Sequence, residues 1–174
     1  MLTSKLMGAG GSTGAAAPTK TLEASASYTD TSKVSEQGNV FTYANCPIGT
    51  ASSDRVLVVL NSTRWNRGIT GVTVGGVAMD VQVASGIDRG YSHIATLLVT
   101  SGTTADIVVT YVARPDDGAM AIYSTTGMSA TATATGSANA DGPTVVSTTL
   151  NVSAGDLLFA SSGSDSGIIG ITLA

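Results

Sequence analysis

The chain has 174 residues, the size of a single domain, and carries a net charge of −4 with an isoelectric point near 4.6. Such an acidic chain lacks the basic footprint of nucleic-acid-binding proteins, so we exclude DNA and RNA as partners. Its one cysteine, Cys46, cannot form an intramolecular disulfide and is expected to be a small buried apolar residue. Because the sequence shows no signal-peptide or membrane-spanning apolar run, we expect a soluble protein made in a cytoplasm, with no membrane partner.

The composition favours an all-β fold. Only 11% of the residues are charged and 5% are aromatic, whereas glycine, alanine, serine, threonine and valine are abundant. Strong helix formers with a charged outer face are scarce and β-branched residues are plentiful, which is typical of short strands joined by Gly-rich turns.

Residues 1–20 differ in composition from the rest of the chain. Leu2, Leu6 and Met7 are apolar, and a linker rich in glycine, alanine, serine and proline follows them. Two interpretations are open: a loose tail, or a docking arm that buries its apolar residues in a groove on a partner, as a helical turn or as a strand. We therefore divide the chain into an N-terminal docking arm and linker, residues 1–20, and a β-sandwich domain, residues 21–174.

The next segments predict the first strands of the sandwich. Residues 21–43 alternate only partly and predict two short strands around a loop. Residues 55–60, Arg-Val-Leu-Val-Val-Leu, are a continuous apolar run of strand length, which predicts a central strand covered on both faces. Residues 61–68 are polar, predict a loop and hold the only tryptophan, Trp65.

Residues 69–83 predict a β-hairpin. Gly75-Gly76 suits a two-residue type I′ turn, which pairs Val74 with Val77 and Val72 with Met79. The alternation of the segment places these four residues on the core face. The residues expected on the opposite face are Thr73, Ala78, Asp80 and Gln82.

Further antiparallel strands are predicted after the hairpin. They span residues 91–99, 105–112, 119–124, 144–152 and 156–161, with a turn at 114–118. Residues 128–142 are low in complexity and form either a tight edge strand or a mobile segment. Residues 162–174 end in an apolar stretch, so we expect them to pair within the fold or with a neighbour, unless the sequence continues beyond residue 174.

The order of these segments resembles a known family. Asp-Arg-Val-Leu-Val-Val-Leu, Ile-Thr-Gly-Val-Thr-Val-Gly-Gly-Val-Ala, Leu-Leu-Val-Thr-Ser-Gly-Thr-Thr-Ala-Asp-Ile-Val-Val-Thr-Tyr and Met-Ala-Ile-Tyr-Ser-Thr-Thr-Gly-Met follow one another as in a β-sandwich domain of tailed-phage structural proteins. The resemblance covers roughly residues 21–161, and the opening Met-Leu-Thr-Ser-Lys-Leu-Met-Gly-Ala-Gly-Gly is similar to the attachment leaders of such proteins. Where members of the family end in a Thr-Trp strand, this chain has Gly-Ile-Thr-Leu-Ala.

The resemblance implies an antiparallel two-sheet sandwich of jelly-roll or Ig-like type with an extended N-terminal arm. It implies a non-enzymatic virion protein without a cofactor, either a head decoration or head fibre protein or a tail fibre module. Such a protein is assembled in the host cytoplasm and displayed on the virion surface. Its partners would be capsid or tail proteins, reached through Leu2, Leu6 and Met7. Small Ala/Thr/Gly strands would also allow homo-oligomers, with a trimer as the first candidate.

Few residues are candidates for chemistry. His93 is the only histidine, and a structural role for it is weighed against a base in a Ser/His/Asp arrangement, for which no Gly-x-Ser-x-Gly elbow exists. The acidic residues near turns raise paired-carboxylate catalysis or calcium binding, but their spacing matches no calcium loop and turn formation explains the adjacent aspartates. These acidic residues are Asp80, Asp88, Asp116 and Asp117. We predict no catalytic residue and no metal ligand.

The loop of residues 64–67, Arg-Trp-Asn-Arg, is the candidate binding site. An exposed tryptophan between two arginines is typical of a binding hot spot and suits a sugar, so Arg64, Trp65 and Arg67 are the predicted ligand-binding residues. In that case the chain would be a carbohydrate-binding adhesion module that recognises a host-surface glycan. The other interpretation is that Trp65 plugs the end of the sandwich while the arginines stay solvated.

Overall fold

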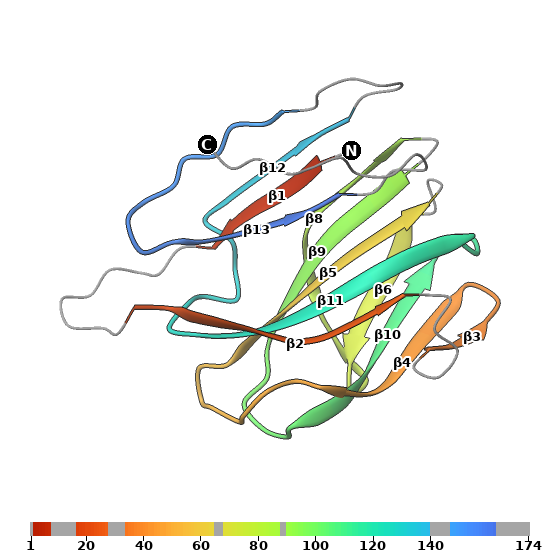
Figure 1. Cartoon of the computed structure of the whole chain (residues 1–174), viewed down its shortest axis with the longest axis horizontal. Helices are drawn as coiled ribbons and strands as arrows, with labels where there is room; N and C mark the ends of the chain where they lie inside the picture. Colours follow the sequence, from red (N-terminus) through yellow and green to blue (C-terminus); the bar gives the residue numbers. More distant parts are fainter. Residues whose placement is uncertain are drawn as a thin grey trace.

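The computed structural model describes residues 2–7, 17–27, 34–64, 68–87, 90–139 and 147–162. Within these ranges every regular element is a β-strand, and all strand pairings are antiparallel. The strands form three sheets, two of which pack face to face as a sandwich (Figure 1). The predicted all-β antiparallel sandwich is therefore confirmed, and a third, smaller sheet is added to it.

The middle sheet has the strand order β2-β11-β5-β9-β8. Its strand β5 pairs with β11 on one side and with β9 on the other, so β5 lies at the centre of the sheet. The bounds are β2 Thr19–Ser27, β5 Val56–Arg64, β8 Asp80–Ile87, β9 Gly90–Leu98 and β11 Asp117–Thr126.

The large outer sheet has the order β3-β4-β10-β6-β7 and covers one face of the middle sheet. Its bounds are β3 Val34–Gln37, β4 Val40–Pro47, β6 Ile69–Val74, β7 Val77–Ala78 and β10 Thr104–Tyr111. The small outer sheet has the order β12-β1-β13, with bounds Ala134–Ala138, Leu2–Met7 and Leu157–Ser161, and lies over the opposite face (Figure 1).

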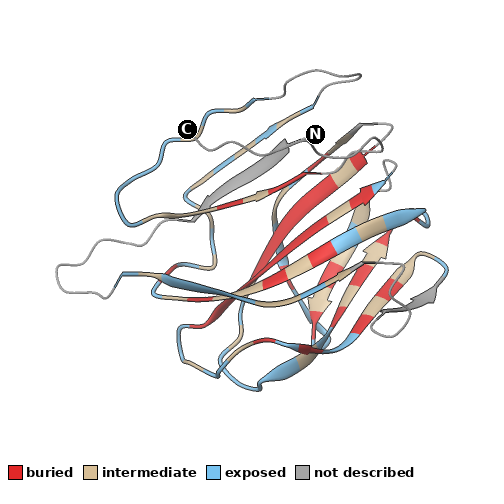
Figure 2. Cartoon of the chain, in the orientation of Figure 1, coloured by how far each residue is buried: buried red, intermediate tan, exposed pale blue. Residues whose placement is uncertain are grey.

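Two hydrophobic cores separate the three layers. The large core lies between the middle and large outer sheets and includes Leu57, Val59 and Ile122. The small core lies between the middle and small outer sheets and includes Val58 and Phe159. Because neighbouring residues of a strand point to opposite faces, β5 supplies both cores and is buried along nearly its whole length (Figure 2). The prediction of a central strand covered on both faces is confirmed.

The hairpin turn forms as predicted, but the second strand of the hairpin, β7, is only two residues long and pairs with only the last two residues of β6. Gly75 and Gly76 have φ angles of 55° and 82°, and Val74 pairs with Val77. The expectation that Val77 faces the core is wrong: its side chain is 58% exposed, because it lies directly after the turn in β7, the edge strand of the large outer sheet. After the buried Met79 the chain leaves the large outer sheet and continues as β8 in the middle sheet, so this segment joins two layers.

Other predicted boundaries shift. Residues 61–64 belong to β5 and not to a loop, because their backbone pairs with β9 and β11. Residues 34–47 form a hairpin whose turn holds Gly38 at a φ of 65°. Of the strand predicted at 144–152, the described residues 147–152 are not in a strand. Residues 134–138 are an edge strand, which confirms one of the two interpretations of the low-complexity segment.

Candidate functional site

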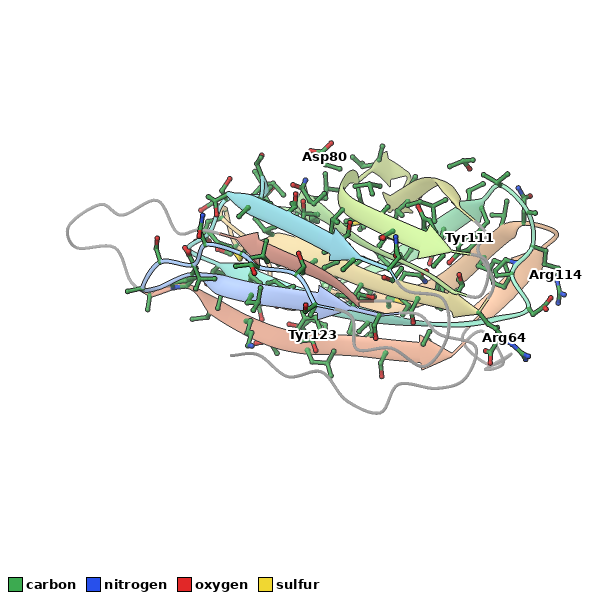
Figure 3. All side chains as sticks on the ribbon, turned by 90° about the horizontal axis from the view of Figure 1, so that it is seen from above. Arg64, Asp80, Tyr111, Arg114 and Tyr123 are labelled. Carbon is green, nitrogen blue, oxygen red and sulfur yellow. The ribbon has the colours of Figure 1, made fainter. Side chains whose placement is uncertain are left out.

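The predicted binding loop begins at one end of the middle sheet. Arg64 is the last residue of β5, is exposed, and lies in register with Asp117 of β11. Arg114, in the turn between β10 and β11, is also exposed, and Figure 3 shows both arginine side chains at the same end of the molecule. Guanidinium groups recognise carboxylate and hydroxyl oxygens through their N–H donors. Trp65 and Arg67 lie outside the described residues, so the aromatic part of this site stays a prediction.

The predicted anchoring residues lie on a paired strand. Leu2, Leu6 and Met7 belong to β1, the middle strand of the small outer sheet, which pairs with β12 on one side and β13 on the other. Leu6 is in register with both Ala134 and Leu158. The extended form of the arm is thus present, but within this chain both of its backbone edges are occupied. The anchoring role of the three side chains stays a prediction.

His93 is fully buried in β9, at 0% exposure. It shares the parity of Ala95, which places its side chain on the face of the middle sheet toward the large core. Its ring centroid lies 6.4 Å from that of Tyr91, and neither imidazole nitrogen hydrogen-bonds to a described residue. Burial lowers the pKa of His93 from 6.5 to about 3, so the ring is neutral at physiological pH. A general base needs a partner within hydrogen-bond reach, and this position provides none among the described residues.

Asn61 of β5 is a buried polar residue that hydrogen-bonds to both outer sheets. The Tyr111 hydroxyl of the large outer sheet donates to its side-chain oxygen over 2.7 Å. The Ser161 hydroxyl of the small outer sheet donates to its backbone oxygen over 3.1 Å. Residues 61–63, Asn-Ser-Thr, match the N-glycosylation sequon, but Asn61 is only 1% exposed and is therefore inaccessible in the folded chain.

Arg55 is a buried cation that binds backbone carbonyls. It is 1% exposed and precedes β5. Its Nε donates to the Val99 oxygen over 2.8 Å, and its Nη2 donates to the Ser101 oxygen over 2.6 Å. Its Nη1 donates to the oxygens of Gly49 and Gly102 over 2.7 and 2.9 Å. Burial lowers the pKa of Arg55, and the nearby Glu23 carboxylate opposes that shift. Arg55 therefore holds two loops together and has few donors left for a ligand.

A cavity of about 280 Å³ opens between β2 and β4, at the edge of the large core. Its walls are mostly apolar, and the Glu23 carboxylate and the Cys46 thiol are among its ionisable groups. The lining residues are Glu23, Ala24, Ser25, Ala26, Tyr43, Ala44, Asn45, Cys46, Pro47 and Met120.

The chemistry of this cavity is limited. The Cys46 thiol is buried and donates to the Tyr43 backbone oxygen over 3.4 Å, whereas a reactive cysteine sits beside a cation or a base. Burial raises the pKa of the Tyr43 hydroxyl above its usual range, with Cys46 adding to the shift. The Glu23 carboxylate accepts a hydrogen bond from the Ser124 hydroxyl. The cavity has room for a small apolar group and no assembled nucleophile and base among its lining residues.

The acidic candidates do not converge. Asp117 accepts a hydrogen bond from the Gly118 amide over 2.7 Å, which is a local turn contact, and Asp80 lies at the start of β8. Asp88 lies outside the described residues. Within the described ranges no group of three or more histidine, cysteine, aspartate or glutamate side chains is placed to hold a metal ion. The described residues also contain no helix that is long and apolar enough to cross a membrane.

The structure therefore defines a class: a layered all-β module whose buried polar residues connect its sheets. No protein-family model matches the chain, and no curated protein or solved structure is significantly similar to it.

Proposed function

We propose that the chain is a non-enzymatic structural protein of a tailed-phage virion, exposed on the particle as a decoration or cement protein or as a fibre module. In this proposal it is anchored by its first strand, β1, and assembles as a homo-oligomer, with a trimer as the first candidate.

The supporting observation is where the phage-like segments lie. The motifs that carry the resemblance to phage β-sandwich domains correspond to β5, to the hairpin β6–β7, to the last two residues of β9 with β10, and to β11. Together these strands supply most of the large core. The resemblance thus follows the packed centre of the fold and is not confined to exposed loops.

The use of the buried polar residues also supports a structural role. Arg55 donates to four carbonyls of its surrounding loops, and Asn61 contacts both outer sheets. Buried hydrogen-bonded groups that join layers stabilise one arrangement of those layers. A displayed module must keep its shape outside the cell, and these groups serve that purpose.

The test is incorporation into particles. A tagged chain is expressed during growth of the phage that encodes it, and density-purified particles are analysed by mass spectrometry and by immunogold labelling of intact virions. We expect the chain in the particles and the label on their surface, over the head for a decoration protein and over the tail for a fibre. Particles that lack the chain after complete assembly would refute the proposal.

The anchoring strand is tested by deletion of residues 1–11. We expect the deleted chain to be lost from particles, while urea unfolding with tyrosine and tryptophan fluorescence reports whether the sandwich still folds. Since the deletion also removes β1 from the small outer sheet, a full-length variant with residues 8–11 replaced by Ser-Gly-Ser-Gly serves as the control. Wild-type incorporation of the deleted chain would contradict anchoring by β1.

A second candidate is the carbohydrate-binding adhesion module, which the exposed Arg64 and Arg114 at one end of the molecule favour. A glycan array probed with the purified chain tests it. Binding of a defined sugar that is lost in Trp65→Ala and Arg64→Ala, but kept in the exposed control Lys20→Ala, would support this function. No binding above background on the array would contradict it.

A further inference from the structure

The small outer sheet depends on β1. Within the described residues β12 and β13 each pair with β1 and with no other strand. β1 runs antiparallel to both, from Leu2 opposite Ala138 to Met7 opposite Leu157. Without β1 the inner edges of β12 and β13 would face each other across a gap of one strand, roughly 10 Å between their axes. Their unpaired amides and carbonyls would then recruit any strand that fits.

The strands on either side of β1 are fixed by contacts of their own. In β13, Phe159 is buried in the small core and its ring lies 5.5 Å from that of Tyr123 in the middle sheet. The Ser92 hydroxyl of β9 donates to the Ser161 oxygen over 3.4 Å. Directly after β12, the Asn139 side-chain oxygen accepts a hydrogen bond from Ser85 of β8 over 2.7 Å. The slot for β1 is therefore held on the middle sheet by residues outside β1.

The connection between β1 and β2 joins strands of two different sheets. β2 pairs with β11 in the middle sheet, so β1 and β2 share no strand pairing. Residues 8–18 join them, and a chain of that length spans at most roughly 40 Å. From residue 8 to residue 17 the sequence contains only glycine, alanine, serine and threonine, so no bulky side chain commits the connection to one route.

We propose that β1 is exchanged between copies: residues 2–7 of one copy insert between β12 and β13 of a second copy. The inserted segment is the same one that lies between β12 and β13 within this chain, so its backbone register is already defined by the structure. Closed and exchanged forms contain the same strand pairs, and the balance between them depends on the connection and on the local concentration of copies. The proposal concerns the purified chain and does not depend on the virion role.

Two single-cysteine variants test the exchange. Ser4→Cys lies in β1 and Ala160→Cys is its register partner in β13, and directly opposite residues of antiparallel strands are close enough for a disulfide. Both variants are made in a Cys46→Ala background, so that each chain carries one thiol. They are mixed in urea, refolded together at increasing concentration, oxidised mildly and analysed by non-reducing gel electrophoresis and mass spectrometry.

We expect a disulfide-linked heterodimer whose yield rises at least several-fold with concentration. It should exceed the yield from the control mixture of Ser4→Cys with Ser53→Cys, an exposed position in the turn before β5. A yield equal to that control at every concentration would overturn the proposal.

A measurement on the unmodified chain guards against variants that fail to fold. After refolding at high concentration and dilution, light scattering coupled to size exclusion should show an oligomer that decays to monomer over minutes to hours, because β1 must leave one slot before it enters another. A monomer at every concentration, or an oligomer that persists unchanged after deletion of residues 1–16, would overturn the exchange.

Discussion

Replacement of His93 by leucine should remove most of the acid sensitivity that burial of this residue causes. His93 is fully buried, and neither of its nitrogens has a hydrogen-bond partner among the described residues. Its neighbours do not compensate a positive charge: Tyr91 lies beside it with a pKa raised by burial, and its register partners are Asn61 and Ala84. Leucine has a similar size and no polar atom, so His93→Leu keeps the packing and removes the titrating group.

The direction and the size of the change in stability with pH follow from the pKa values of His93 in the folded and unfolded chain. The folded chain holds the pKa of His93 at about 3, whereas the unfolded chain has the ordinary value of 6.5. Below pH 6.5 the unfolded state binds a proton that the folded state does not, so stability is full above that pH and falls as the pH drops toward 3. The slope of 1.36 kcal/mol per pH unit applies over the two units from pH 6.5 to pH 4.5, so the expected loss between pH 7.5 and pH 4.5 is about 3 kcal/mol.

The assay is urea unfolding followed by fluorescence, at half-unit steps from pH 7.5 to pH 4.5, on the wild type and on His93→Leu. Carboxylates also titrate in this range, including Asp54, whose pKa is lowered by hydrogen bonds from Ser52 and from the Gly127 amide. They are common to both proteins and cancel in the difference. We expect the free energy of unfolding of the variant to equal or exceed that of the wild type at pH 7.5. The difference in favour of the variant should grow by about 3 kcal/mol at pH 4.5. Parallel curves would refute the reasoning, because they would show that the buried ring finds a partner or water.

Three further predictions concern stability and are measured by the same unfolding assay at pH 7.5. Arg55→Met should lose about 3–5 kcal/mol, because four carbonyls lose their charged donor; a loss below 1 kcal/mol would show that the loops do not need it. Gly136→Ala places a methyl carbon 2.8 Å from a threonine hydroxyl and should cost about 1–3 kcal/mol, whereas Gly71→Ala, with open space around it, should cost about 1 kcal/mol or less; equal costs would contradict the close approach. Val74→Thr should cost about 1–3 kcal/mol and the exposed Val77→Thr within about 0.5 kcal/mol of zero; equal effects would contradict the asymmetry of the hairpin.

Local turn chemistry and short-range alternation predicted the hairpin well, and tertiary packing decided the rest. Two consecutive glycines specify a type I′ turn, and the turn fixes the pair Val74 and Val77. Val74 is buried and Val77 is exposed because β7 is the edge strand of its sheet, and the order of strands in a sheet is not encoded locally in the sequence. The crossing of the chain into the middle sheet after Met79 depends likewise on the arrangement of two sheets.

The apolar run at the start of β5 predicted burial on both faces, but not what covers the second face. That face is covered by the small outer sheet, whose strands come from residues 2–7, 134–138 and 157–161. Pairings across more than a hundred residues leave no periodic signal in the sequence. The first of these strands follows a leucine spacing that suits either a helical turn or a strand, and the second is composed of alanine, threonine, glycine and serine.

The buried polar residues could be predicted from the sequence only in part. The structural interpretation of His93 was available from the sequence, because a lone histidine without a partner motif is most often structural. The role of Arg55 could not be predicted from the sequence, because its hydrogen-bond partners are carbonyl oxygens of two loops, at Gly49 and at residues 99–102. A charged residue directly before a run of five apolar residues was the available signal, because such a position is hard to expose.

The layered arrangement explains why the buried polar residues gather in β5 and β9. A strand with both faces covered cannot send a hydroxyl or an amide to water, so each such group needs a partner in a neighbouring layer or strand. The Ser92 hydroxyl donates to the Ser161 oxygen of β13, the Asn61 side chain accepts from the Tyr111 hydroxyl of β10, and the Thr96 hydroxyl donates to the Ala130 oxygen. The Ser161 hydroxyl of β13 also donates to the Asn61 backbone oxygen. An apolar interface alone would let the small outer sheet slide over the middle one, whereas these directional bonds fix its position. For the same reason we expect β12 and β13 to keep their places when β1 leaves, which is the condition that the proposed strand exchange requires.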